Sequence, residues 1–74
     1  MANGIGWAVK ELQNGNYVRR VGWNGKGMYL YLETADTFTM HDPYVVMYTA
    51  QGTHQPGWLC SQADLLATDW ELVV

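Results

Sequence analysis

The sequence has few of the features that usually stabilise or anchor a short chain. Its single cysteine, Cys60, cannot form a disulfide within the chain. The two histidines, His41 and His54, form no paired metal-binding spacing with that cysteine, so the pattern indicates no metal site. No apolar run approaches the ~18 residues of a membrane span, and the first residues lack the basic and apolar regions of a secretory signal. We therefore expect a cytosolic protein.

The small size of the chain is a physical reason to expect self-association. A chain of 74 residues buries only about 60% of its unfolded surface, so hydrophobic gain and lost conformational entropy nearly cancel. Aromatic residues (four Trp, five Tyr and one Phe) make up 14% of the chain, and charged residues only 15%. So small a core cannot bury all of these rings, and Tyr and Trp are favoured at interfaces. The composition predicts an oligomer, or a pocket lined with aromatic side chains.

Positive charge is absent from the last two thirds of the chain. The formal net charge is −3, which opposes non-specific binding to duplex DNA. Residues 28–74 carry acidic side chains and no cation. An anion-binding site should therefore come from the first third of the chain, although so few cations also cluster by chance. The cations are Lys10, Arg19, Arg20 and Lys26.

The apolar pattern predicts an α+β fold in a single domain, residues 1–74. It consists of an N-terminal helix, a small and mostly antiparallel sheet, and a short helix before the last strand. Ser61 followed by Asp64 is similar to a capping box and predicts that short helix, to about residue 67. Strands are predicted at 17–21, 28–33, 37–40 (an edge strand), 44–49 and 70–74. Loops or turns are predicted at 24–25, 41–43, 51–52 and 55–57, with 58–59 returning to the sheet.

Residues 5–14 are predicted to form the first helix, capped by Asn3 and ended by Gly15. Trp7 lies off its apolar face, which suggests that the helix packs on another chain or folds over a loop of its own. The apolar face consists of four residues at helical spacing: Ile5, Ala8, Val9 and Leu12.

The residues do not assemble a catalytic site. Cys60 adjoins Trp58-Leu59 and is interpreted as a buried structural thiol. No pair of carboxylates stands out as an acid/base couple, and Asp64 is interpreted as a helix-start residue. Both histidines are expected at the surface. The sequence therefore predicts neither a catalytic residue nor a metal ligand.

The segment from Gly22 to Gly27 is the most informative part of the chain. Its glycines allow backbone N–H groups to approach a ligand closely. Lys26, together with the preceding arginines, offers charge to a phosphate, and Trp23 offers a stacking surface for a base. This is a plausible nucleotide pocket. An ordinary hairpin turn with a surface lysine and a packed tryptophan also explains the segment, and by itself the segment favours that simpler interpretation.

Two longer runs are similar to a known family. Residues 18–30 carry the pattern RRxGWNGKGM, and residues 58–71 carry SQxDLLAxDWE. Together with the helix that ends in Asn14-Gly15, these runs resemble the phage-encoded Thoeris anti-defence family of the second type. The resemblance covers about two thirds of the chain, and the pairing of the two motifs makes it specific.

The resemblance implies a non-catalytic sponge that needs no cofactor. Such a protein would bind the glycocyclic ADP-ribose signals of Thoeris, or cyclic oligonucleotide signals of CBASS, in the cytoplasm of the infected host. It would act as a homotetramer with pockets between protomers and with no nucleic-acid or membrane partner. Three alternatives stay open: a hydrolase that degrades the signal, a small inhibitor that docks on a host protein through its aromatic surface, and, less well supported, a DNA mimic.

The resemblance also implies ligand-binding residues. Trp23 is expected as a wall that stacks on a base, with Asn24 and the Gly25 N–H as polar readers. One of the two arginines would meet a pyrophosphate, and Asp64 would accept from a ribose hydroxyl or from Arg20. Trp70 is expected in the core. Residues 34–57 are shorter than in many relatives, residues 37–43 do not align securely, and this segment is expected to help shape the pocket. The full predicted set is Arg19, Arg20, Trp23, Asn24, Gly25, Lys26, Met28, Tyr29, Ser61, Gln62 and Asp64.

Overall fold

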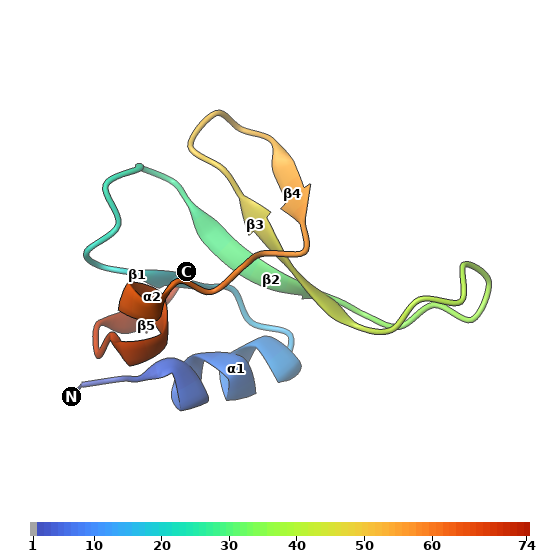
Figure 1. Cartoon of the computed structure of the whole chain (residues 1–74), viewed down its shortest axis with the longest axis horizontal. Coiled ribbons are helices and arrows are strands. Elements are labelled where there is room, and N and C mark those ends of the chain that lie inside the picture. Colours follow the sequence, from blue (N-terminus) through green and yellow to red (C-terminus); the bar gives the residue numbers. More distant parts are fainter. Residues whose placement is uncertain (1) are drawn as a thin grey trace.

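The computed structural model describes residues 2–74, which form two helices and five strands (Figure 1). Neighbouring strands are all antiparallel, in the order β4-β3-β2-β1-β5. The predicted α+β fold, with an N-terminal helix and a short helix before the last strand, is confirmed. The elements are α1 (Ile5–Gln13), β1 (Val18–Arg20), β2 (Tyr29–Glu33), β3 (Tyr44–Tyr48), β4 (His54–Pro56), α2 (Gln62–Leu66) and β5 (Trp70–Leu72).

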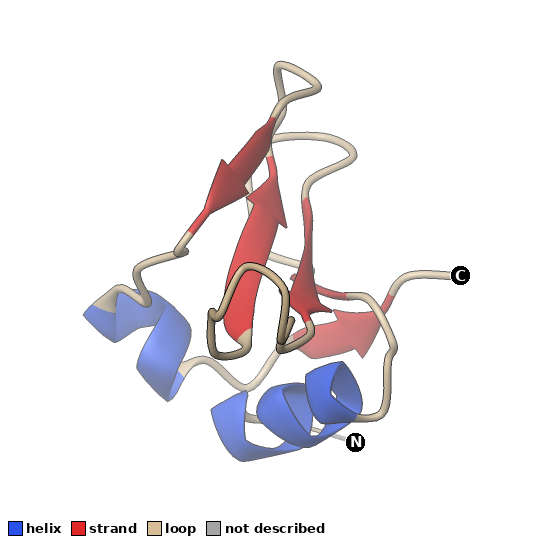
Figure 2. Ribbon diagram, turned by 90° about the vertical axis from the view of Figure 1, so that its right-hand side faces the viewer, coloured by secondary structure: helices blue, strands red, loops and turns tan. Residues whose placement is uncertain are grey.

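The core lies between one face of the sheet and the two helices, which lie side by side below it (Figures 1 and 2). Neither helix is long and apolar enough to cross a membrane, within the part of the chain that the structure describes. Antiparallel pairing sets Val18 opposite Leu30, so the middle of the sheet presents adjacent apolar side chains to α1. The buried core cluster is Ala8, Leu12, Val18, Leu30 and Trp70.

The aromatic residues divide between the two faces of the sheet. Trp70 is buried on the helix side, and the other three tryptophans pack against that core. The opposite face carries all five tyrosines, here called the tyrosine face. This division follows from chemistry, because a phenol needs a partner for its hydroxyl and tolerates a half-open surface. The tyrosine face consists of Tyr17, Tyr29, Tyr31, Tyr44 and Tyr48.

Rings on the tyrosine face contact one another closely. Tyr29 stacks on Tyr48 with centroids 4.9 Å apart, and Tyr17 lies 5.1 Å from Tyr29. Val46, on the same face, is buried among these neighbours. No helix covers this face within residues 2–74, and 48% of Tyr17 is exposed. The tyrosine face is therefore an ordered aromatic surface that no helix of the described chain covers, although His54 contacts Tyr31 and Tyr48 there.

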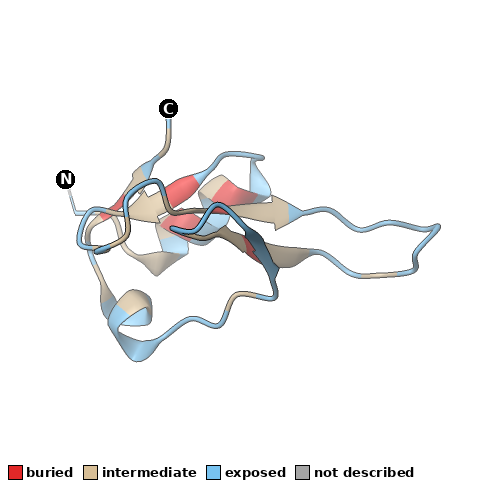
Figure 3. Ribbon diagram, turned by 90° about the horizontal axis from the view of Figure 1, so that it is seen from above, coloured by how far each residue is buried: buried red, intermediate tan, exposed pale blue. Residues whose placement is uncertain are grey.

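Residues 34–43 form an arm that projects from the far ends of β2 and β3 and is largely exposed (Figures 1 and 3). An antiparallel bridge between Asp36 and His41 closes its tip, and Asp36 Oδ1 accepts from the Phe38 N–H at 2.8 Å. The predicted edge strand at 37–40 is wrong, because these four residues fold back as a turn with Met40 at φ 59°. Phe38 and Met40 are 93% and 87% exposed.

The region after β3 also differs from its prediction. Residues 54–56, predicted within a loop region, form β4 at the edge of the sheet. Pro56 is compatible with an edge strand because its missing N–H costs no ladder bond on the open side. Trp58-Leu59 does not return to the sheet: the N–H groups of Gly57 and Trp58 both donate to the Val45 carbonyl, and the chain then leaves β3.

Three predictions about α1 need correction. Asn3 does not cap the helix, because Gly4 is the N-cap residue and the Asn3 side chain donates to the Trp70 carbonyl instead. Trp7 packs partly buried against the chain's own core. Val9, predicted on the apolar face, is 43% exposed. Gly15 ends the helix in a left-handed conformation at φ 86°, as predicted.

Removing a core side chain should destabilise the fold far more than removing an exposed one of the same type. Leu30 is 1% exposed, whereas Leu66 is 75% exposed. We expect Leu30→Ala to lower the free energy of unfolding by about 2–5 kcal/mol and Leu66→Ala to change it little. Urea unfolding at one fixed protein concentration measures both variants. Equal losses for the two would contradict this assignment of the core.

Candidate functional site

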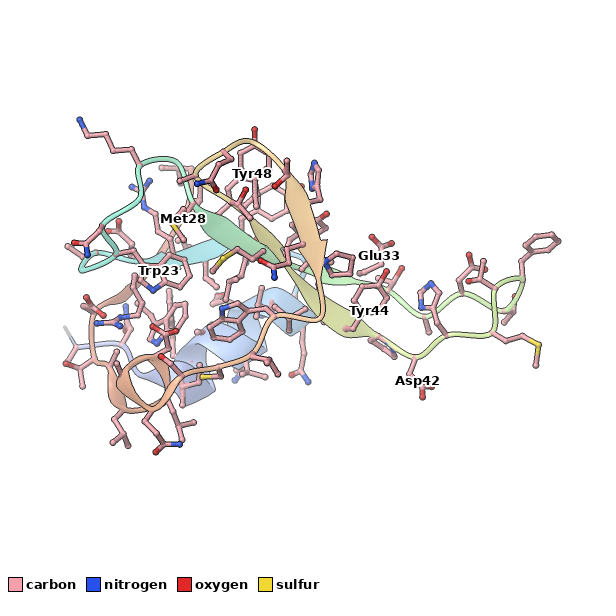
Figure 4. All side chains as sticks on the ribbon, turned by 45° about the horizontal axis from the view of Figure 1, so that its top comes forward. Trp23, Met28, Glu33, Asp42, Tyr44 and Tyr48 are labelled. Carbon is pink, nitrogen blue, oxygen red and sulfur yellow. The ribbon has the colours of Figure 1, made fainter. Side chains whose placement is uncertain are left out.

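The candidate site is an open pocket of about 310 Å³ over the loop that joins β1 to β2. Trp23 and Met28 lie at this end of the molecule, and Asp42 on the arm lies at the other end (Figure 4). The arm therefore takes no part in this pocket within one chain, and the expectation that residues 34–57 shape a pocket between protomers stays a prediction. The lining residues are Arg19, Arg20, Val21, Trp23, Gly25, Lys26, Gly27, Met28 and Glu71.

The structure brings together six of the predicted residues and places the others elsewhere. Asn24 belongs to the same loop but does not line the pocket. Tyr29 lies on the tyrosine face, and Ser61, Gln62 and Asp64 cap or begin α2. The six lining residues are Arg19, Arg20, Trp23, Gly25, Lys26 and Met28.

Sequence reasoning missed Glu71 as part of this wall. Strand β5 pairs with β1 in a register that sets Glu71 beside Arg19. The Arg19 Nε donates to Glu71 Oε1 at 2.7 Å, and both side chains are about 40% exposed. The signal in the sequence was the opposite charge of Arg19 and Glu71 on two predicted strands. Only the register between β1 and β5 shows that the two side chains lie side by side.

The loop owes its shape to close packing rather than to the predicted turn at Asn24-Gly25. The residue in the left-handed region is Gly27, at φ 79°, and neither Asn24 nor Gly25 lies there. A Cβ at Gly25 would collide with the Met28 sulfur and approach the Ala50 Cβ to 3.0 Å. A larger residue at Gly25 would need the flexible Met28 side chain, which folds back over the loop, to move and Ala50 to shift slightly.

Arg20 is held between two carboxylates. Its Nη1 donates to Asp64 Oδ1 and its Nε donates to Asp69 Oδ1, each at 2.8 Å. Hydrogen bonds with Asp69 and then Asp64 raise the pKa of Arg20. Asp64 is therefore an acceptor for Arg20, one of the two roles considered for it. Its main-chain N–H donates to the Ser61 hydroxyl at 3.1 Å, which confirms that Ser61 caps α2.

Both carboxylates titrate below the ordinary aspartate range. The bond from Arg20 is the main cause of the lowered pKa of Asp69, assisted by the Gly22 N–H. Burial acts to raise the pKa of Asp64, but bonds from Arg20, Trp23 and Ser61 outweigh it, and the pKa is lowered. Both groups therefore stay ionised well into the acid range.

The acidic side chains around the pocket loop are paired with arginines. Asp64, Asp69 and Glu71 are each bonded to an arginine. Cys60 is exposed, so the expected buried thiol is wrong; desolvation of the sulfur and the charge of Asp64 raise its pKa, which makes it a weak nucleophile. Among residues 2–74, no three His, Cys, Asp or Glu side chains are grouped to hold a metal ion.

The chain is similar in sequence to a known protein family. A family model described as the Thoeris anti-defense 2-like domain matches residues 3–73. A protein of Bacillus phage SP01 described as "Thoeris anti-defense 2" is 31% identical over 82 residues, covering 93% of this chain and 92% of that protein. The similarity thus spans the pocket loop, both helices and the whole sheet.

The lowered pKa values predict a loss of stability in acid. A carboxyl group whose folded pKa lies below its ordinary value of 3.8 stabilises the fold above about pH 4, and this contribution disappears as the pH falls through the lowered value. We expect the unfolding temperature to fall between about pH 5 and pH 2. Asp69→Asn should be less stable at neutral pH and decline less steeply.

Asp42→Asn is the matched control for that measurement. Asp42 lies exposed on the arm, and its carboxylate makes no side-chain hydrogen bond within residues 2–74. Thermal unfolding of the three proteins across the pH range gives the three slopes. A slope for Asp69→Asn as steep as that of the unaltered chain would refute the assignment of acid sensitivity to the Arg20 contacts.

Proposed function

The chain belongs to the Thoeris anti-defense 2-like family, and we propose that it binds cyclic nucleotide immune signals and sequesters them without cleaving them. Family membership supports a role in phage anti-defence. The proposed cargo is a glycocyclic ADP-ribose or a cyclic oligonucleotide, held in the cytoplasm of the infected host. By lowering the free signal, the protein would keep the downstream effector of the bacterium inactive.

The combination of groups in the pocket is the observation that carries this proposal. Lys26 is exposed at the rim and makes no side-chain hydrogen bond or ion pair within residues 2–74, so its ammonium is free for a phosphate. Arg19 has only an exposed ion pair to give up, and such pairs contribute little to stability. Trp23 supplies an aromatic wall for a base in the same pocket.

The state of the acidic groups supports binding without hydrolysis. A general base must reach the substrate with a free lone pair. Each of the three carboxylates nearest the pocket loop accepts a hydrogen bond from an arginine, which leaves it less available as a base, and the pKa of Cys60 is raised. Capture then depends on affinity: a cyclic ligand has few rotatable bonds, so little of its entropy is lost on binding.

The pocket is small for such a ligand, which favours a site completed by a second copy. Its volume of about 310 Å³ lies at the lower end of the usual range for ligand pockets, about 300–1,000 Å³. Arg19 and Glu71 extend from the same sheet face as the tyrosines, so the pocket opens at the rim of the tyrosine face. We propose that copies associate through this face into a homotetramer and close the pocket between them.

A capture experiment tests the proposed function directly. Purified protein is mixed with a panel of glycocyclic ADP-ribose isomers and cyclic dinucleotides, passed through a filter that retains protein, and then heated. A sponge should return intact nucleotide at a fixed ratio to protomers. Continued loss of nucleotide at substoichiometric protein would identify a hydrolase instead. Complete flow-through of unaltered nucleotides would reject the sponge and favour a host-protein partner.

Matched lysine variants test the location of the site. Removal of one charged hydrogen bond costs about 1.5–3 kcal/mol, so Lys26→Gln should weaken capture at least tenfold. Lys10→Gln removes the same charge from the exposed part of α1, outside the pocket, and should leave capture unchanged. Isothermal titration measures both. Equal affinities for Lys26→Gln and Lys10→Gln would place the ligand elsewhere.

Charge introduced on the tyrosine face should break the assembly. Tyr48→Glu would place a carboxylate among stacked rings, where an interface would have to desolvate it. Phe38→Glu is the control, because Phe38 is 93% exposed at the tip of the arm. Sedimentation velocity should show a tetramer for the unaltered chain and Phe38→Glu, and smaller species for Tyr48→Glu. A monomeric unaltered chain, or a tetrameric Tyr48→Glu, would refute this interface.

A further inference from the structure

Unlike the other two cations of the pocket, Arg20 has its positive charge already paired with two neighbouring carboxylates. Its side chain is 19% exposed, and two carboxylates contact its guanidinium at 2.8 Å. One positive charge therefore faces two negative ones. A phosphate that approached Arg20 would meet the field of both aspartates, whereas Lys26 presents its charge alone. Arg20 therefore lines the pocket but is poorly suited to bind a phosphate there.

Each of the two carboxylates makes a second bond, and both second bonds reach the start of the pocket loop. The Gly22 main-chain N–H donates to Asp69 Oδ2 at 2.7 Å. The Trp23 indole Nε1 donates to Asp64 Oδ1 at 3.0 Å. Two successive loop residues are thus held, one by its backbone and the next by its ring. We call Arg20, Asp64 and Asp69 the clamp.

Packing around the clamp leaves little freedom for the loop. A Cβ at Gly22 would lie 2.9 Å from Asp69 Oδ2 and 3.3 Å from Arg20 Nη2, so the carboxylate sits directly against the glycine backbone. The Trp23 ring meets Trp70 edge-on, with centroids 5.5 Å apart. Contact with a buried ring and a fixed indole N–H together set the plane of Trp23, which also lines the pocket.

We propose that Asp64 and Asp69, themselves held by Arg20, are positioning residues that keep Gly22 and Trp23 in the ligand-binding conformation before any ligand arrives. This inference rests on the proposed function. The clamp raises affinity by keeping nearly all molecules competent to bind, since apparent affinity scales with the competent fraction. Arg19 and Lys26 then attract the anionic ligand, and the clamp keeps the aromatic wall in place.

A purely electrostatic effect and a positioning effect predict opposite changes in ligand affinity for the same substitution. Asp64→Asn and Asp69→Asn each remove one negative charge beside a pocket for an anion, so charge alone would tighten binding. A loosened clamp would weaken it instead, by about tenfold if one molecule in ten keeps the binding conformation. Titration of a glycocyclic ADP-ribose isomer into each variant distinguishes the two effects by sign.

Glu71→Gln is the matched charge control. Glu71 lines the same pocket and pairs with Arg19, and within residues 2–74 its side chain makes no hydrogen bond or ion pair with the clamp. Removing its charge frees Arg19 and should tighten binding a few-fold. The expected pattern is therefore weaker binding for the two aspartate variants and tighter binding for Glu71→Gln. Tighter or unchanged binding for both aspartate variants would overturn the inference while leaving the sponge intact.

A measurement without ligand supplies an independent readout. The Trp23 indole N–H donates to the Asp64 carboxylate, whereas the Trp70 indole N–H donates to the Asp64 main-chain carbonyl at 3.2 Å. In Asp64→Asn, hydrogen exchange followed by NMR should speed up at the Trp23 indole and stay slow at that of Trp70. General unfolding would accelerate both, and unchanged exchange at Trp23 would overturn the clamp. Failure of the unaltered chain to bind any nucleotide would overturn the proposed function, and this inference with it.

Discussion

The bonds of a single guanidinium hold together parts of the chain that are far apart in sequence. Arg20 lies at the end of β1, Asp64 lies in α2 and Asp69 immediately precedes β5, so their contacts join the second half of the chain to the first. The same carboxylates hold the entrance of the pocket loop. A buried or half-buried charge needs its partners in good geometry, or it costs more than it contributes. The positions of α2, β5 and the pocket loop are therefore coupled to one another through Arg20.

The second constraint is the size of the core. The chain has few buried residues, and its tryptophans lie on the face of the sheet that the helices cover. There Trp7, Trp23 and Trp58 pack against the buried core. The tyrosines remain on a face that no helix in residues 2–74 covers. In the proposed oligomer, association would bury this face and add stability to a chain whose own core is small. Binding of a ligand at the rim of that face would then be coupled to assembly.

Sequence reasoning predicted the parts of the structure governed by local rules. Gly15 ends α1, Ser61 caps α2, Trp70 enters the core and the alternation in Tyr29–Glu33 gives a strand, each for the physical reason that the residues themselves supply. Several of the failures originate in long-range contacts, whereas the wrong strand at 37–40 is a local turn. Asn3 prefers a bond to Trp70, and Glu71 reaches the pocket only through the register of β5. Likewise, the division between free Lys26 and committed Arg20 depends on two aspartates more than forty positions away, as their sequence separations of 44 and 49 show.

The arm has a consequence for how this chain can change over generations. Its residues support neither the core cluster nor the pocket, and its tip is closed by contacts within the arm itself. Substitutions and changes of length there are nearly neutral for folding. Selection can therefore act on Phe38, Met40 and their neighbours independently of the rest of the protein. In a contest between a phage and its host, the arm is a part of this molecule that can vary without disturbing its core.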